Sequence, residues 1–139
     1  MVLDTNVVLD WLLFDDPRCA ALTEAIGTGR VRWLASTEMR DELEDVLTRG
    51  IAPKRKRDPA AVLAQWDRWA VIAEPGDQPS PRELRCSDGD DQKFIDLALQ
   101  VRAAALISRD RAVLKLARRA ALHGLTIVSI ADWKPARPA

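Results

Sequence analysis

Four acidic residues that lie far apart in this sequence could meet to bind a metal ion: Asp4, Glu42, Asp91 and Asp110. Asp4 directly follows the short apolar segment of residues 1–3, and open α/β sheets keep their ligand sites at the carboxyl ends of their strands. The other three acids can reach the same edge of the sheet. A cluster of carboxylates without a histidine partner is typical of a site for a hard divalent cation, Mg²⁺ or Mn²⁺. Such a site indicates phosphodiester chemistry.

Charge repulsion makes a counter-charge necessary if these side chains converge. Two like charges about 4 Å apart repel by about 4 kcal/mol at an effective dielectric constant near 20. Three or four such carboxylates would rival the whole stability of a domain, roughly 5–15 kcal/mol. Either some carboxylates are protonated or a cation neutralises them. The single histidine, His123, stands beside Gly124 at the expected end of a helix, so we interpret it as a surface residue and not as a catalyst.

Helix geometry ranks the acids around Glu42. In the helix expected over residues 37–49, Glu42 is the acid nearest to the apolar stripe, so its carboxylate can lean over the end of the sheet. The alternative is a surface charge paired with Arg40 or Arg49. This helix alone does not decide between the two.

The acids near residue 90 exceed what a helix start needs, because one acid is enough to cap it. Asp91 is in line with the apolar residues of the following turns, so it points inward, whereas Asp90 suits the cap. Asp4 and Asp110 each follow an apolar strand and precede a helix. A helix cap alone is the alternative interpretation of Asp4. Capping by Asp110 leaves one of its oxygens free to face a metal.

The elements that position these side chains alternate along the chain. Near-continuous apolar segments predict buried strands of a parallel sheet, at residues 2–3, 31–35, 71–73, 104–107 and 126–130. Helices are expected at residues 17–26, 37–49, 59–69, 88–102 and 111–122. We therefore predict an α/β fold, a three-layer α/β/α domain with a central parallel sheet of about five strands. The domain covers residues 1–133, and a disordered tail is expected at residues 134–139.

Composition restricts the class of protein without naming a function. The chain has 21 basic and 21 acidic residues, so it has no global charge that favours nucleic acid, although an acidic pocket and a basic rim would cancel in the sum. Cys19 and Cys86 lack metal-ligand spacing and are interpreted as buried or incidental thiols. No apolar segment approaches the roughly 20 residues that span a bilayer. We expect a soluble, cytoplasmic protein.

Several motifs, taken in order, match a known family. They are Leu3-Asp4-Thr5-Asn6-Val7, the segment of residues 36–47, Asp88-Gly89-Asp90-Asp91-Gln92-Lys93-Phe94, and Ala105-Leu106-Ile107-Ser108-Arg109-Asp110. The chain resembles PIN domains, and most closely the bacterial PIN-family toxin components of toxin–antitoxin systems, which are related to VapC-type ribonucleases. The likeness extends to about Trp133.

This resemblance implies that the four acids, Asp4, Glu42, Asp91 and Asp110, are catalytic and hold one or two Mg²⁺ or Mn²⁺ ions. It implies supporting roles for three further polar residues: Asn6, Asp88 and Ser108. The chain departs from the usual family pattern where Ser108 replaces threonine, Gly89 replaces proline and Arg109 replaces a small residue. None of these departures removes a carboxylate, but Arg109 could alter access of the substrate.

The expected activity is metal-dependent hydrolysis of RNA by an endoribonuclease, with no side-chain nucleophile. An acidic pocket needs basic groups around it to hold RNA, and the candidates are Lys54, Arg55, Lys56, Arg57, Lys93 and Arg109, with Arg111 and Lys115 nearby. The alternative for residues 54–57 is a solvated loop. Trp66 and Trp69 are interpreted as packing or interface residues rather than as base-stacking platforms.

The resemblance also implies partners: a cognate antitoxin that blocks the pocket, and a second copy of the chain. Plausible contacts of a homodimer are residues 12–14 and Trp66. Two rival functions stay open at this point. One is an RNA- or partner-binding module without turnover. The other is an aspartate-based phosphatase, although Asp4-Thr5-Asn6 lacks the second aspartate that many such enzymes use as the acid.

Overall fold

All five strands expected from the apolar segments occur in the computed structural model, which describes residues 1–50 and 56–135. They are β1 (Val2–Leu3), β2 (Trp33–Ala35), β3 (Ala70–Ile72), β4 (Ala105–Ile107) and β5 (Thr126–Val128). The strands pair in parallel, with β4 between β1 and β5, and with β2 beside β3. The N–H of Leu34 donates to the carbonyl of Met1 at 2.9 Å. The predicted sheet is therefore a three-stranded and a two-stranded sheet that meet along β1 and β2.

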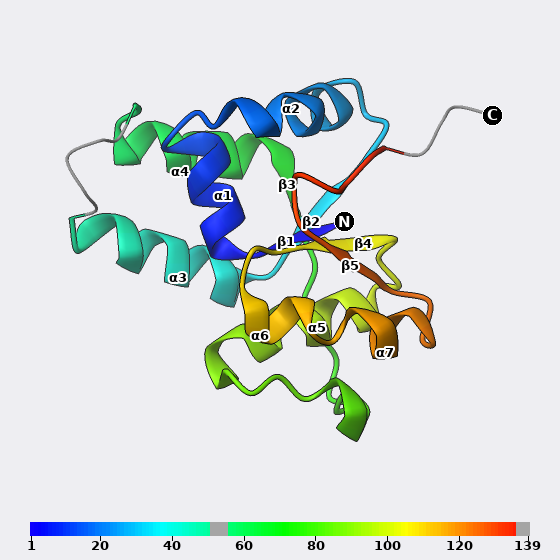
Figure 1. The fold of residues 1–139 in the computed structure, drawn as a ribbon. Helices are drawn as coiled ribbons and strands as arrows, with labels where there is room; N and C mark the ends of the chain where they lie inside the picture. The colour runs from blue at the N-terminus through cyan, green and yellow to red at the C-terminus, as the bar shows by residue number, and fades with distance from the viewer. Residues whose placement is uncertain (51–55, 136–139) are drawn as a thin grey trace.

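Helices cover both faces of these strands, as the three-layer prediction required (Figure 1). One side carries α1 (Thr5–Leu12), α2 (Ala20–Gly27) and α4 (Pro59–Trp69), and the other carries α5 (Gln92–Gln100), α6 (Arg111–Leu114) and α7 (Ala117–Ala121). The helix α3 (Thr37–Thr48) follows β2. Three short 3₁₀ helices complete the described elements: η1 (Pro17–Cys19), η2 (Arg82–Leu84) and η3 (Gly89–Asp91).

The helix starts use the caps that the sequence offers. The hydroxyl of Ser36 accepts from the N–H of Met39 at the start of α3. Asp58 accepts from the N–H of Ala60 at the start of α4, and Pro59 takes the first helical position, where its missing N–H costs nothing.

Three predicted helices are shorter or more divided than expected. The helix predicted over residues 17–26 begins as the 3₁₀ helix η1 and continues as α2. The helix predicted over residues 111–122 is split into α6 and α7, because Leu116 donates to the carbonyl of Val113 and tightens one turn to 3₁₀ geometry. The helix predicted over residues 88–102 starts as η3 and ends at Gln100. Arg102 then adopts a positive φ of 53°, which turns the chain towards β4.

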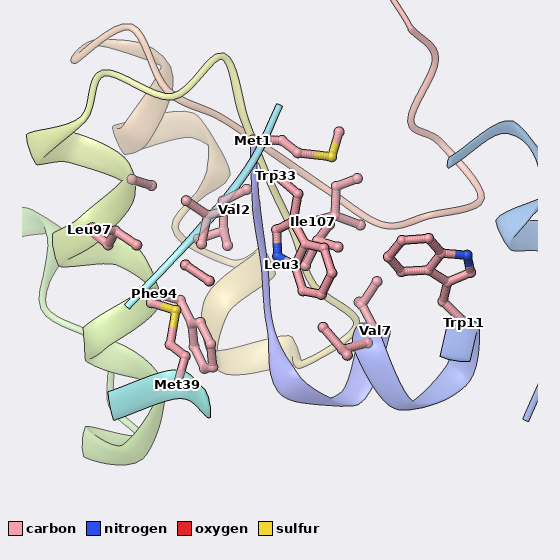
Figure 2. Close-up of a cluster of buried hydrophobic side chains, with 14 of the residues drawn as sticks. Met1, Val2, Leu3, Val7, Trp11, Trp33, Met39, Phe94, Leu97 and Ile107 are labelled. Atoms are coloured by element: carbon pink, nitrogen blue, oxygen red, sulfur yellow. The ribbon is translucent and has the colours of Figure 1, made fainter. Parts of the chain in front are cut away.

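The core is continuous across both faces of the strands. Figure 2 shows Leu3 and Ile107 between Phe94 of α5 on one side and Trp11 of α1 on the other. Around Trp33, tryptophan rings pack edge to face. The centroid of Trp33 lies 5.4 Å from that of Trp11 and 5.8 Å from that of Trp66. This geometry is the one that aromatic quadrupoles favour.

Burial corrects three of the expected homodimer contacts, whereas Phe14 is only partly buried and stays a prediction. Leu12, Leu13 and Trp66 are 3%, 0% and 3% exposed, because they belong to the core, so they cannot form an outer contact surface. The packing role expected for Trp66 is confirmed. No helix within residues 1–50 and 56–135 has the length and apolarity to cross a membrane. Of the expected tail, residues 136–139 lie outside the described part of the chain.

Candidate metal centre

The register of two strands brings two distant segments to one edge of the sheet. β1 and β4 pair with Val2 opposite Leu106 and Leu3 opposite Ile107, and the N–H of Asp4 continues the ladder to the carbonyl of Ile107 at 3.1 Å. Asp4 and Ser108 therefore leave their strands side by side. The hydroxyl of Ser108 donates to the carboxylate of Asp4 across 104 residues of sequence. Both residues therefore lie at the carboxyl edge of the sheet, where the sequence predicts the site.

Asp4 is buried, and both of its carboxylate oxygens accept hydrogen bonds. The residue is only 2% exposed. Its Oδ1 accepts from the N–H of Val7 at 3.0 Å and so caps α1. Its other oxygen accepts from Ser108. Burial raises the pKa of Asp4, and the hydrogen bonds from Ser108 and Val7 oppose that rise. Asp4 is therefore a helix cap that also brings a carboxylate to the edge of the sheet.

Three other carboxylates form a group that could hold a metal ion. Asp88, Asp91 and Asp110 each offer an oxygen, and these oxygens lie within 4.8 Å of one another. Asp88 caps η3 by accepting from the N–H of Asp90 at 3.0 Å. Asp110 caps α6 by accepting from the N–H of Ala112 at 2.8 Å. Helix starts thus hold two of the three side chains in place.

Ser108 connects Asp4 to this group, which we call the acidic triad (Asp88, Asp91 and Asp110). The N–H of Asp110 donates to the Ser108 hydroxyl oxygen at 3.1 Å, while that hydroxyl donates to Asp4. Ser108 is fully buried. The serine therefore contacts two of the predicted acids at once.

Asp91 is crowded by the other carboxylates around it. Burial raises the pKa of Asp91 to about 7, helped by a hydrogen bond with Asp110 and by repulsion from the charges of Asp110, Asp88 and Asp4. Its Oδ2 is buried and has no hydrogen-bond partner within the described parts of the chain. Buried carboxylate oxygens without donors are costly, and a divalent cation removes that cost. The donor set therefore fits a hard cation held by oxygen ligands.

The sequence profile of the PIN domain family matches residues 1–112. The chain belongs to the PIN domain family. PIN domains are generally nucleases and typically use divalent metal ions, and the matched range contains every acid described above. No protein of curated function matches the sequence. The matched range therefore includes the acidic triad, which could hold a divalent ion of the kind that PIN domains typically use.

Glu42, the remaining acid of the predicted quartet, lies outside the acidic triad in this PIN domain. One of its oxygens accepts from the hydroxyl of Thr5, and the other accepts from the ammonium of Lys93. The structure therefore brings Asp91 and Asp110 together with Asp88, places Asp4 behind Ser108, and gives Glu42 a partner of opposite charge.

The other candidate residues of the PIN domain occupy varied places. Asn6 is exposed on α1. Arg109, also exposed, donates from Nε to Asp10 at 2.9 Å. Arg57 pairs with Asp15 at 3.1 Å and also donates to backbone carbonyls at the end of α1. Lys56 is exposed, whereas Lys54 and Arg55 lie outside the described residues.

The sequence does not reveal three contacts of these residues. They are the hydrogen bond from Thr5 to Glu42, the bond from Arg109 to Asp10, and the ion pair of Lys93 with Glu42. The sequence predicts an RNA contact for Lys93, because nothing in it indicates a partner 51 residues away. The clearest usable signal concerned Asp88. It precedes Asp91 by three positions, so a single helical turn places both carboxylates on one side.

Proposed function

We propose that this PIN domain is a divalent-metal-dependent endoribonuclease that hydrolyses RNA phosphodiester bonds. The observation that carries the proposal is the acidic triad, whose oxygens lie within 4.8 Å of one another at the carboxyl edge of a parallel sheet. The buried, partnerless Oδ2 of Asp91 supports a cation there. Oxygen donors without nitrogen or sulfur favour Mg²⁺ or Mn²⁺ over zinc.

Each residue of the site has a task in this proposal. Asp88, Asp91 and Asp110 would hold the ion, and Asp4 adds negative charge behind them through Ser108. When bound, such an ion acidifies a water molecule and offsets charge on the phosphoryl oxygens. The exposed guanidinium groups of Arg109 and Arg111 flank Asp110 and can attract RNA phosphates to the rim of the acidic pocket.

A cleavage assay tests the proposal. The full chain is incubated with a fluorophore–quencher single-stranded RNA in Mn²⁺, in Mg²⁺ and in EDTA. Cleavage is expected with either ion and none in EDTA, and Asp91→Asn should abolish it. Asp41→Asn, which neutralises an exposed acid of α3, is the matched control and should cleave normally. Full cleavage in EDTA would contradict the proposal.

A toxin role is the finer part of the proposal. Its support is the likeness of the four motifs to PIN-family toxins, which also favours a cognate antitoxin and a homodimer in the cytoplasm. Induced expression of the wild-type chain should arrest growth, and Asp91→Asn should not. Growth arrest by both proteins would point to a cause other than RNA cleavage.

The rival functions fit the site less well. An aspartyl phosphatase needs an accessible nucleophile, but Asp4 is 2% exposed and both of its oxygens accept hydrogen bonds. A non-catalytic RNA-binding module would show RNA affinity without cleavage in Mn²⁺, which the same assay detects.

A further inference from the structure

The acidic triad and Glu42 differ in the partners that surround their carboxylates. The acidic triad contains a buried oxygen that lacks a donor in the described part of the chain. Glu42 is the opposite case, because Thr5 and Lys93 each donate to one of its oxygens. The acidic triad would therefore be stabilised by a cation, whereas Glu42 already has the ammonium of Lys93 as its cationic partner.

Three contacts hold the ammonium of Lys93 in place. It donates to Glu42 and to the backbone carbonyl of Asp90, and it lies 4.9 Å from the centroid of the Phe94 ring. The Lys93 side chain is 13% exposed, and that of Glu42 is 30% exposed. A carboxylate, a carbonyl and an aromatic face thus surround one ammonium, which is the environment that a desolvated cation needs.

The position of Lys93 in the chain links this ion pair to the acidic triad. Lys93 follows Asp91 by two residues at the start of α5, and Thr5 follows Asp4 directly. A divalent ion that approached Glu42 would meet the fixed positive charge of Lys93, and like charges at contact distance repel strongly in a partly buried site.

We propose that this chain binds a single divalent ion, at the acidic triad, and that the ammonium of Lys93 takes the place at Glu42 that a second ion would otherwise occupy. This inference rests on the proposed function, because it specifies the metal stoichiometry of the same site. Lys93 is then a positioning residue, which holds Glu42 and excludes a second ion, rather than an RNA contact.

The test is the number of Mn²⁺ ions bound by the full chain, measured by calorimetric titration and by the loss of the free Mn²⁺ signal in electron paramagnetic resonance. The wild-type protein should bind one ion. Lys93→Met should bind two, because removal of the ammonium leaves Glu42 available. Lys134→Met removes an exposed lysine that lies with Ala104 and Thr126 at the opposite edge of the strands, and it should still bind one ion.

A second pair of variants separates the two acidic groups. Glu42→Gln should keep one bound ion with unchanged affinity, since Glu42 does not contact that ion. Asp91→Asn should lower the Mn²⁺ affinity by about tenfold or more, because it alters the coordinating group itself. Lys93→Gln is the alternative to Lys93→Met if the latter does not fold, and it carries the same expectation of two ions.

The outcomes are distinguishable. Two ions on the wild-type protein, or one ion on a folded Lys93 variant, would overturn the single-ion inference while leaving the ribonuclease proposal intact. A wild-type protein that binds no Mn²⁺ would overturn the proposed function itself.

Discussion

Asp91 is the side chain whose charge is most unfavourably placed among the acids described above. It is held among acids by the start of α5, it shares a hydrogen bond with Asp110, and one of its oxygens is buried without a partner in the described chain. Without a metal, the fold keeps this carboxyl group protonated at pH values where an ordinary aspartate is charged. Its ionisation should therefore be visible in the stability of the metal-free protein.

The pKa of Asp91 gives this effect a sign. It rises from 3.8 to about 7 on folding, so the folded chain binds more protons than the unfolded chain between these values. The stabilising contribution of the protonated group is complete below pH 3.8 and is lost as the pH rises through about 7. Asp91→Asn lacks this loss, because an amide stays neutral.

We expect Asp91→Asn to be more stable than the wild type in EDTA at pH 8, with a smaller advantage at pH 5. The measurement is the melting temperature of both proteins at the two pH values. Asp41→Asn, at an exposed position of α3, should show no such pH-dependent difference. An equal advantage of Asp91→Asn at both pH values would show that its ionisation does not destabilise the fold.

Which acids share a site could be predicted only in part from the sequence. The order of apolar strand and aspartate placed Asp4 and Asp110 at one edge of the sheet, and the periodicity of α5 pointed Asp91 inward. The separation of Glu42 from the acidic triad was not predictable, because it depends on an ion pair between α3 and α5. Side-chain pairing across 51 residues leaves no periodic trace.

At the scale of elements, α3 is the helix whose start matters most for this ion pair. Ser36 is 1% exposed at the end of β2, and its hydroxyl accepts from the N–H of Met39. The helix then carries Glu42 to Thr5 of α1 and to Lys93 of α5. A weaker start of α3 should therefore destabilise the fold and loosen these contacts.

Ser36→Ala should lower the free energy of unfolding by about 1 kcal/mol, since the N–H of Met39 loses its acceptor. Urea denaturation of the two proteins measures this difference. Ser87→Ala, at an exposed position outside the helices, is the control and should have little effect. If both variants unfold at the same urea concentration, the cap of Ser36 contributes nothing.

The elements themselves were largely predictable because their signals are local. Apolar runs marked the five strands, and Ser36 and Asp58 marked helix starts. The break between α6 and α7 was not predictable, because residues 111–122 have the composition of one helix and only the packed chain selects the tight turn at Leu116.

On the scale of the whole molecule, the fold assembles an acidic edge within a chain of zero net charge. β1 and β4 deliver Asp4 and Asp110, and η3 delivers Asp88 and Asp91. These segments are far apart in the sequence and meet only in the folded chain. An ion bound to the acidic triad therefore stabilises contacts that exist only in the folded chain.

Binding of a metal ion to the folded chain should raise the stability of the protein. An ion that binds the folded but not the unfolded chain adds about 2.7 kcal/mol of stability at a free concentration a hundredfold above its Kd. The melting temperature of the wild-type protein should thus rise steadily with Mn²⁺ concentration, and that of Asp91→Asn should rise much less. Mn²⁺ titrations followed by differential scanning calorimetry give this comparison. Equal shifts for both proteins would mean that Mn²⁺ binds elsewhere, because only the acidic triad contains the altered oxygen.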